Sequence, residues 1–277
     1  MISKSSIQDY SGNRILQKEN DYIYILPNEL LRPYISHYTL TFPNKNIISD
    51  NYTVIPNGSS TLVFTFDGNK IGNRLYGTAT RINKVGDEAN LSIELLIISF
   101  RPCGLFQFIK QNQRELTDHL LPVESVDFTL YKAIYNIFDQ SEGIYELISK
   151  LDNVFLSYLD RITLSSEVVL TMDKIKGSNG MISVNELSKY IYYSERHLNR
   201  IFGQCCGMNV KSFLKLVRMN KAIKLLQNPQ NNMTMVALQS GFYDQPHFIH
   251  EFKSICNITP QEYLDNMSDF YNQITES

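Results

Sequence analysis

The chain has 277 residues, of which 43% are hydrophobic, and this size favours two folded domains over one. No apolar run approaches the ~20 residues that a membrane-spanning helix needs, and the N-terminus lacks the apolar stretch of a signal peptide, so we expect a cytoplasmic protein with no membrane partner. The four cysteines form no CxxC pair and the five histidines show no ligand spacing, which predicts no disulfide framework, no metal site and no cofactor.

The net charge of −2 combines two parts of opposite sign. Residues 174–260 carry eleven Lys and Arg against four Asp and Glu, which gives +7, whereas the other residues carry 15 against 24, which gives −9. This asymmetry is typical of a basic nucleic-acid-binding module joined to an acidic domain. The alternative is chance clustering of charge on a solvated surface.

The first hundred residues contain short β-branched and aromatic runs separated by turn residues. Such runs favour an antiparallel barrel or sandwich, with a turn at Pro56-Asn57-Gly58. The predicted strands are 22–26, 52–55, 60–66 and 91–100.

After Pro102 the apolar spacing becomes helical and predicts helices over 105–112, 129–139 and 144–161. The last of these carries an apolar stripe, which suits core packing or, as an alternative, a dimer contact. We therefore expect an N-terminal domain over residues 1–163 that is β-barrel- or sandwich-like, with flanking helices.

From residue 164 the pattern is helical, so the predicted fold class is α+β with an all-α C-terminal domain over 164–277. Ser183 and Glu186 form a capping box before one helix, and Ser194 caps the next. A long helix is predicted over 211–227. Residues 176–180 (Lys-Gly-Ser-Asn-Gly) are the one clear linker.

The stretch 241–253 (GFYDQPHFIHEFK) predicts a helix end, a tight turn and the capped start of another helix. Gly241 supplies a positive φ, and Asp244 is a good N-cap. Phe248 and Phe252 share one buried face, which leaves a polar front suited to base edges in a major groove.

The predicted arrangement is therefore two helix-turn-helix units joined by a helical rod. A rod of 17 residues is about 25 Å long, which allows both recognition helices to reach one face of a duplex about 34 Å apart.

These residues resemble the AraC/XylS family of bacterial transcription regulators over roughly 165–268. The first unit matches S-x-x-x-L-x-R-x-F from Ser194 to Phe202, and the long helix matches R-x-x-x-A-x-x-L-L from Arg218. The second unit matches A-x-x-x-G-F-x-D-x-x-x-F-x-x-x-F-K from Ala237 to Lys253, before the terminal P-x-x-Y. The resemblance implies a non-enzymatic, sequence-specific regulator bound to double-stranded promoter DNA, with RNA polymerase as a partner if it is an activator.

Candidate DNA-contacting residues lie on the two recognition helices. Arg196 and Arg200 suit guanine, and Asn199 suits adenine. For each candidate the alternative is an exposed polar side chain that has no role in DNA binding. The full set is Ser194, Arg196, Asn199, Arg200, Gln245, His247, His250 and Lys253.

Three positions on the matched segment carry further predictions. Tyr192 stands where the first turn of the family has glycine, which predicts either a different turn or a left-handed tyrosine. His250 stands where arginine is frequent, which predicts weaker phosphate attraction in the second unit. Arg218 is predicted either to follow DNA phosphates or to pack its stem between the two units.

The N-terminal part resembles the sensor domain of some of these regulators, so we expect it to bind a small-molecule effector, to form a homodimer, or both. Arg101 follows an apolar strand and is a candidate contact for an anionic effector, with a surface arginine as an equal alternative. The main alternative function is an effector-independent regulator whose N-terminal domain only dimerises. An enzyme with a helical adaptor is a further alternative, but the sequence carries no catalytic motif that supports it.

Overall fold

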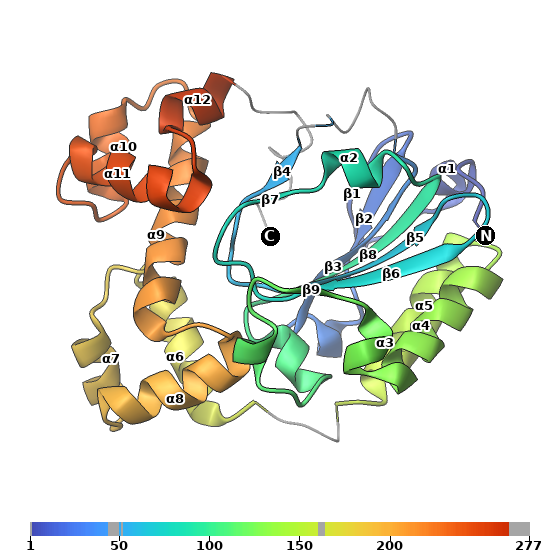
Figure 1. The fold of residues 1–277 in the computed structure, drawn as a ribbon, viewed down its shortest axis with the longest axis horizontal. Helices are drawn as coiled ribbons and strands as arrows, with labels where there is room; N and C mark the ends of the chain where they lie inside the picture. The colour runs from blue at the N-terminus through green and yellow to red at the C-terminus, as the bar shows by residue number, and fades with distance from the viewer. Residues whose placement is uncertain (1, 44–49, 51, 160–163, 266–277) are drawn as a thin grey trace.

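The computed structural model describes residues 2–43, 50, 52–159 and 164–265, and it joins a sheet-based N-terminal part to a helical C-terminal part (Figure 1). This is the predicted α+β class. The boundary that we predicted between residues 163 and 164 falls at 160–163, which lie outside the described residues between α5 (Ile144–Leu156) and α6 (Ser166–Gly177).

The N-terminal part contains a seven-stranded antiparallel sheet in the order β1-β2-β3-β8-β5-β6-β9, and a two-stranded ladder of β4 with β7. All four predicted strands are confirmed as β2, β4, β5 and β8, and the others were not predicted. Their bounds are β1 (Ile15–Lys18), β2 (Tyr22–Ile25), β3 (Ile35–Thr41), β4 (Thr53–Val54), β5 (Thr61–Phe66), β6 (Ile71–Tyr76), β7 (Asn83–Lys84), β8 (Glu94–Phe100) and β9 (Leu120–Leu121).

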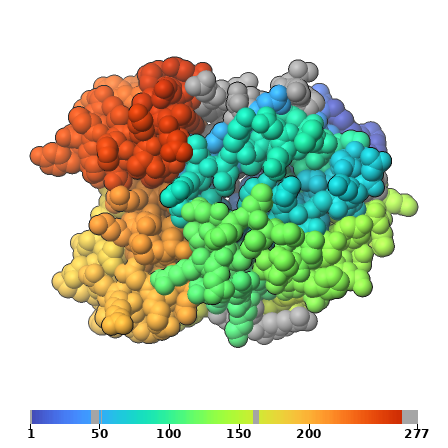
Figure 2. Space-filling view, viewed as in Figure 1, coloured from blue at the N-terminus to red at the C-terminus, as the bar shows by residue number. Residues whose placement is uncertain are grey.

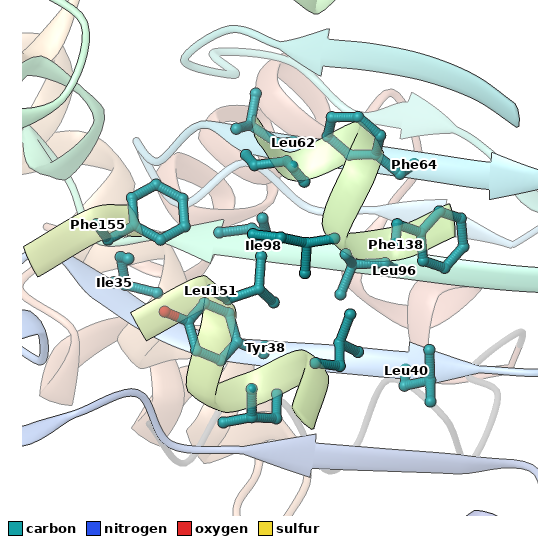
Figure 3. Packing of buried hydrophobic residues seen from close by; sticks show 14 of the residues in the cluster. Ile35, Tyr38, Leu40, Leu62, Phe64, Leu96, Ile98, Phe138, Leu151 and Phe155 are labelled. Atoms are coloured by element: carbon teal, nitrogen blue, oxygen red, sulfur yellow. The ribbon is translucent and has the colours of Figure 1, made fainter. Parts of the chain in front are cut away.

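One face of the sheet packs on α4 (Phe128–Gln140) and α5 and forms the main core (Figure 3). Alternate residues of the paired strands β3, β5 and β8 point into this core, because successive side chains of a strand face opposite sides. Figure 3 shows Tyr38, Leu62 and Ile98 of these strands beside Phe138 and Phe155 of the helices. The residues between them therefore face the other side of the sheet.

The prediction of a helix over residues 105–112 is wrong. A 3-10 turn, η2 (Gly104–Gln107), occupies its start, and a second, η3 (Gln113–Glu115), follows it. The chain enters η2 through Cys103, at a φ of 64°, and a Cβ on Gly104 would lie 2.0 Å from the Tyr34 carbonyl oxygen. The apolar spacing that predicted a helix instead reflects the burial of Leu105, Phe108 and Ile109 in an irregular segment that packs closely on Tyr34.

Short helical elements complete the N-terminal part. They are α1 (Ser6–Asp9), η1 (Glu29–Leu31), α2 (Gly86–Ala89) and α3 (Val123–Val126). The prediction for 129–139 is confirmed by α4. The prediction for 144–161 is confirmed as far as Leu156, where α5 ends.

The C-terminal part is helical throughout, as predicted. Ser183 and Glu186 form the capping box in both directions, Ser194 caps α8 (Glu195–Cys206), and Asp244 caps α11 (Gln245–Cys256). Lys176 and Gly177 end α6 and residues 178–180 form the turn that follows it, so this segment lies inside the C-terminal part and does not link the two domains. Its helices are α6, α7 (Val184–Tyr190), α8 (Glu195–Cys206), α9 (Val210–Leu226), α10 (Met233–Gln239), α11 (Gln245–Cys256) and α12 (Pro260–Asp265).

The two parts pack against each other through α8 and α9. The Asn220 Nδ2 atom on α9 donates to the Pro56 carbonyl at 3.1 Å. The ring of Phe213 lies so close to Gly58 that a Cβ there would be 2.7 Å from it. Figure 2 shows the green segment that contains η3 packed against the yellow and orange helices.

Candidate nucleic-acid interface

The first helix-turn-helix unit consists of α7, a turn and α8. Tyr192 has a φ of 57° and is 92% exposed, so the turn contains the left-handed tyrosine that we predicted as one of two outcomes. The Tyr193 amide closes the end of α7 by donating to the Ser188 carbonyl at 3.0 Å. Ser194 then accepts from the His197 amide at 3.2 Å and begins α8.

Helix α8 presents a basic stripe to solvent. Leu198 and Phe202 are fully buried on its inner side, whereas Arg196 and Arg200 are exposed one turn apart. Arg200 reaches Gln204 Oε1 at 3.4 Å. Neither arginine forms an ion pair with a carboxylate of the described residues, so both guanidinium groups are available to an external acceptor.

Asn199 differs from its neighbours because its amide is already used inside the domain. Its Oδ1 accepts from the Val210 amide at 3.0 Å, and its Nδ2 donates to the Glu195 carbonyl at 2.9 Å. The first bond ties α8 to the start of α9, and the second lies within α8. An adenine contact by Asn199 would have to use the second lone pair of Oδ1 and the second hydrogen of Nδ2, with the amide held in this orientation.

The second unit consists of α10, a turn and α11. Gly241 has a φ of 78°, as predicted, and Asp244 accepts from the His247 amide at 2.8 Å. The turn is one residue longer than the first, and the extra residue, Tyr243, is 86% exposed. Phe248 and Phe252 are fully buried, which confirms the predicted inner face of α11.

The outer side of α11 carries His247, His250 and Lys253, all exposed. The Nδ1 atom of His247 accepts from the Tyr243 amide at 3.3 Å, which directs Nε2 towards Glu251 at 3.9 Å. Gln245 accepts from the Thr234 hydroxyl at 2.8 Å. His250 and Lys253 are therefore less constrained than the two residues at the start of the helix.

Helix α9 has 17 residues and is about 25 Å long, and α8 and α11 lie at its two ends (Figure 1). Arg218 on this helix is half-buried: its Nη1 donates to the Gly180 carbonyl at 3.0 Å, and its guanidinium lies 5.9 Å from the centre of the Phe242 ring. These contacts join the two units, which is the structural role predicted as one of two for Arg218.

Sequence reasoning missed one residue beside the interface. Arg114 of η3 donates from Nη2 to the Asn199 carbonyl at 2.7 Å, and its guanidinium lies against Gly203. Both contacts flank the stripe of Arg196 and Arg200 on α8. The contact joins residues 85 positions apart, so no local sequence signal identifies it.

The second face of the sheet, opposite α4 and α5, borders a cavity of about 380 Å³. Side chains of β3, β5 and β8 that alternate with the core residues line it, and Asn220 and Lys224 of α9 lie on its wall. No cluster of His, Cys, Asp or Glu in the described residues could hold a metal ion, and no described helix is long and apolar enough to cross a membrane.

All four cysteines are buried. Burial raises the pKa of Cys205 to about 11 and that of Cys256 to about 12. These thiols are therefore protonated at neutral pH, and the vicinal pair Cys205-Cys206 belongs to the packing of α8.

Family models match both parts of the chain. Residues 187–266 match a helix-turn-helix domain model, and residues 24–122 match a domain of unknown function (DUF6597). An uncharacterised HTH-type transcriptional regulator of Staphylococcus aureus is 30% identical over 126 residues, which is 43% of this chain and 17% of that protein. One from Haemophilus influenzae is 24% identical over 141 residues, which is 46% of this chain and 47% of that protein.

Two solved structures are similar. ToxT from Vibrio cholerae is 17% identical with a TM-score of 0.41, and the match covers 79% of this chain and 95% of that one. The C-terminal domain of AraT, a response regulator from Geobacillus stearothermophilus, is 22% identical with a TM-score of 0.36, and the match covers 39% of this chain and 93% of that one. This chain thus spans only about a sixth of the S. aureus relative, but nearly all of ToxT.

Proposed function

We propose that this protein, whose C-terminal part is an AraC-type helix-turn-helix DNA-binding domain, is a sequence-specific transcription regulator that acts at promoters. The observation that carries the proposal is the pair of capped recognition helices at the two ends of α9. A rod of about 25 Å, with the widths of the flanking helices, suits major grooves one helical turn apart on one face of the duplex.

The two recognition helices have different parts in this proposal. Arg196 and Arg200 bind guanine O6 and N7. Both side chains are exposed, and neither forms an ion pair with a carboxylate of the described residues. On α11, His247, His250 and Lys253 contact base edges or phosphates, while Ser194 and Gln245 position the helix starts near the backbone. Asn199 contributes by holding α8 against α9.

A footprint on the cognate promoter, found by mapping bound genomic DNA, tests this proposal. We expect two protected segments on one face of the duplex, about one turn apart. Arg196→Ala and Arg200→Ala should each weaken specific binding by about 1–3 kcal/mol and leave non-specific binding nearly unchanged. Lys110→Ala, which removes an exposed cation of the N-terminal part, is the control. A single protected segment, or unchanged affinity in both arginine variants, would contradict the assignment.

The N-terminal part, in this proposal, binds a small-molecule effector in the cavity on the second face of the sheet. The cavity is within the size range of small-molecule sites and is enclosed partly by Asn220 and Lys224 of α9. Asn220 also bonds to Pro56 across the domain contact. A ligand that binds here touches the helix that holds both recognition helices, so occupancy can alter their placement.

Thermal unfolding in the presence of candidate metabolites tests effector binding, because a ligand of the native state raises the midpoint. A substitution that fills the cavity, Val63→Phe, should abolish the shift. If no compound shifts the midpoint and the purified protein carries no bound molecule, the effector-independent alternative holds. Contact with RNA polymerase, homodimer formation and a cytoplasmic location belong to the same proposal and await their own tests.

A further inference from the structure

We propose that the cavity binds a small organic anion and that Arg101 is the residue that holds its acidic group. This inference rests on the proposed effector function and specifies the chemical class of the effector. It depends on the charge of the cavity wall, the way Arg101 is held, and the chemistry of the surrounding side chains.

The charged residues that line the cavity leave an excess of positive charge. They comprise the carboxylate of Glu88 and the cations of Arg74, Arg101 and Lys224. Glu88 already pairs with Arg74, with 3.6 Å between Oε2 and Nε. Arg101 and Lys224 have no carboxylate partner among the described residues, so the unbalanced charge of the wall is positive.

Arg101 is half-buried at the end of β8 and is fixed by the backbone. Its Nε donates to the Arg32 carbonyl at 2.7 Å, and its own amide donates to the Tyr34 carbonyl at 2.8 Å. Arg101 lines the cavity, and its Nη1 and Nη2 make no hydrogen bond to another described residue, so both remain for a carboxylate or a phosphate that accepts two parallel hydrogen bonds. Burial lowers the pKa of Arg101 somewhat, but a guanidinium stays protonated at neutral pH.

A neutral histidine lies beside this cation. His37 on β3 is 6% exposed, and burial, followed by the charge of Arg101, lowers its pKa to about 4. Ser36 Oγ lies 3.1 Å from its Nδ1. His37 therefore adds a hydrogen-bonding group to the acidic end of the ligand without adding a charge, and Arg101 supplies the attraction.

The rest of the cavity suits a partly apolar body. Val63 of β5 with Leu95 and Ile97 of β8 form an aliphatic surface, and the aromatic rings of Tyr24 and Tyr52 border it. A free inorganic phosphate or sulfate ion has no apolar part, so it would leave this aliphatic surface exposed to water. The fitting class is an aliphatic or aromatic carboxylate, or a phosphate monoester, that is small enough for about 380 Å³.

Matched pairs of compounds that differ in charge test the inference on the full-length protein. Phenylacetate is compared with phenylacetamide, hexanoate with hexanamide, and phenyl phosphate with phenol, by thermal unfolding and titration calorimetry. We expect at least one anion to raise the unfolding midpoint and its neutral partner not to do so. The carboxylate and phosphate arms distinguish the two acidic groups.

Variants assign the effect to Arg101. Arg101→Gln should weaken binding of the active anion by roughly tenfold or more, because a charged hydrogen bond is lost in a site shielded from water. Arg101→Lys retains the charge and should keep the preference for the anion at reduced affinity, which tests the proposal if the glutamine variant does not fold. Arg81→Gln removes an exposed arginine outside the cavity and should bind as the parent does.

Equal binding of a neutral partner, retained affinity in Arg101→Gln, or no binding of any anion at millimolar concentration would overturn the inference. Binding of a neutral compound alone would leave an effector site in place and refute only its anionic class. Promoter binding by the parent, measured in parallel, reports separately on the proposed regulator.

Discussion

The two helix-turn-helix units share one architecture but differ in chemistry and in surroundings. The first exposes Arg196 and Arg200 and is held against the N-terminal part, where Arg114 bonds to the backbone of α8. The second exposes two histidines, and the Nδ1 of one of them already accepts from the turn before α11. The helix with the exposed arginines is thus the one that Arg114 of the N-terminal part contacts directly.

In the proposed function, this difference places regulation and specificity in the same unit. A ligand that shifts η3 or the Pro56–Gly58 turn changes contacts to α8 and α9 directly. It reaches the second unit through α9 and the Arg218 contacts, and the second unit also approaches the N-terminal part where Tyr263 of α12 interacts electrostatically with Tyr52. In the proposed function, the second unit serves mainly to add affinity and to fix the spacing of the two major grooves.

Removal of an aromatic ring from either core should cause the largest loss of stability. Phe202→Ala and Phe252→Ala should each lower the free energy of unfolding by about 3–5 kcal/mol, because both rings are fully buried. Phe202 packs on Phe213, which touches Gly58, so its loss should also loosen the N-terminal part.

Urea unfolding measures both losses, and limited proteolysis reports which part opens. We expect new cleavage in both parts for Phe202→Ala, but only in the C-terminal part for Phe252→Ala. The same cleavage pattern in both variants would show that the domain contact does not distinguish the units.

The two turns should respond to substitution with opposite signs. Gly241→Ala should lower the free energy of unfolding by about 1–2 kcal/mol, because a φ of 78° is strained for any residue with a Cβ. Tyr192→Gly should stabilise by up to about 1 kcal/mol, since it relieves a left-handed conformation and the exposed ring loses little packing, while the flexibility of glycine offsets part of the gain. Thermal unfolding checks both, and a loss in Tyr192→Gly would mean that the ring contributes to the fold.

Substitution of the two N-cap residues should cause the smallest losses of stability, and the two losses should be similar. Ser194→Ala and Asp244→Ala should each lower the free energy of unfolding by about 1 kcal/mol. The loss should be somewhat larger for Asp244→Ala, because the charge of the aspartate also interacts favourably with the helix N-terminus. Ser254→Ala, which removes an exposed hydroxyl bonded only to a carbonyl within α11, is the control and should stay within about 0.5 kcal/mol. A cost near zero for either cap would show that its helix start is held by packing alone.

The helical part was predictable because its signals are local. Caps, turn glycines and i, i+4 apolar pairs act within a few residues, and Ser194, Asp244 and Gly241 take the predicted roles. The sheet was predicted less completely. In β3 the pairing shifts between Ile35 and His37, which breaks the alternation that marks a strand, and β6 contains Gly72 and Asn73, which disfavour strands.

The long-range contacts were not predictable from the sequence. Nothing near Arg114 indicates that it meets α8, and nothing near Asn199 shows that its amide is used inside the domain. The length of α9 was predictable from its local apolar pattern, whereas the contact of the N-terminal part depends on how two distant segments fold.

The most direct test measures the affinity of two double variants for the cognate promoter fragment and for unrelated DNA. Arg196→Ala/Arg200→Ala should raise the dissociation constant for the cognate fragment roughly 100-fold or more, and His247→Ala/His250→Ala roughly tenfold or less, with little change on unrelated DNA. An equal loss in the two double variants, or a greater loss in the histidine pair, would contradict the claim that the first unit supplies most of the specificity.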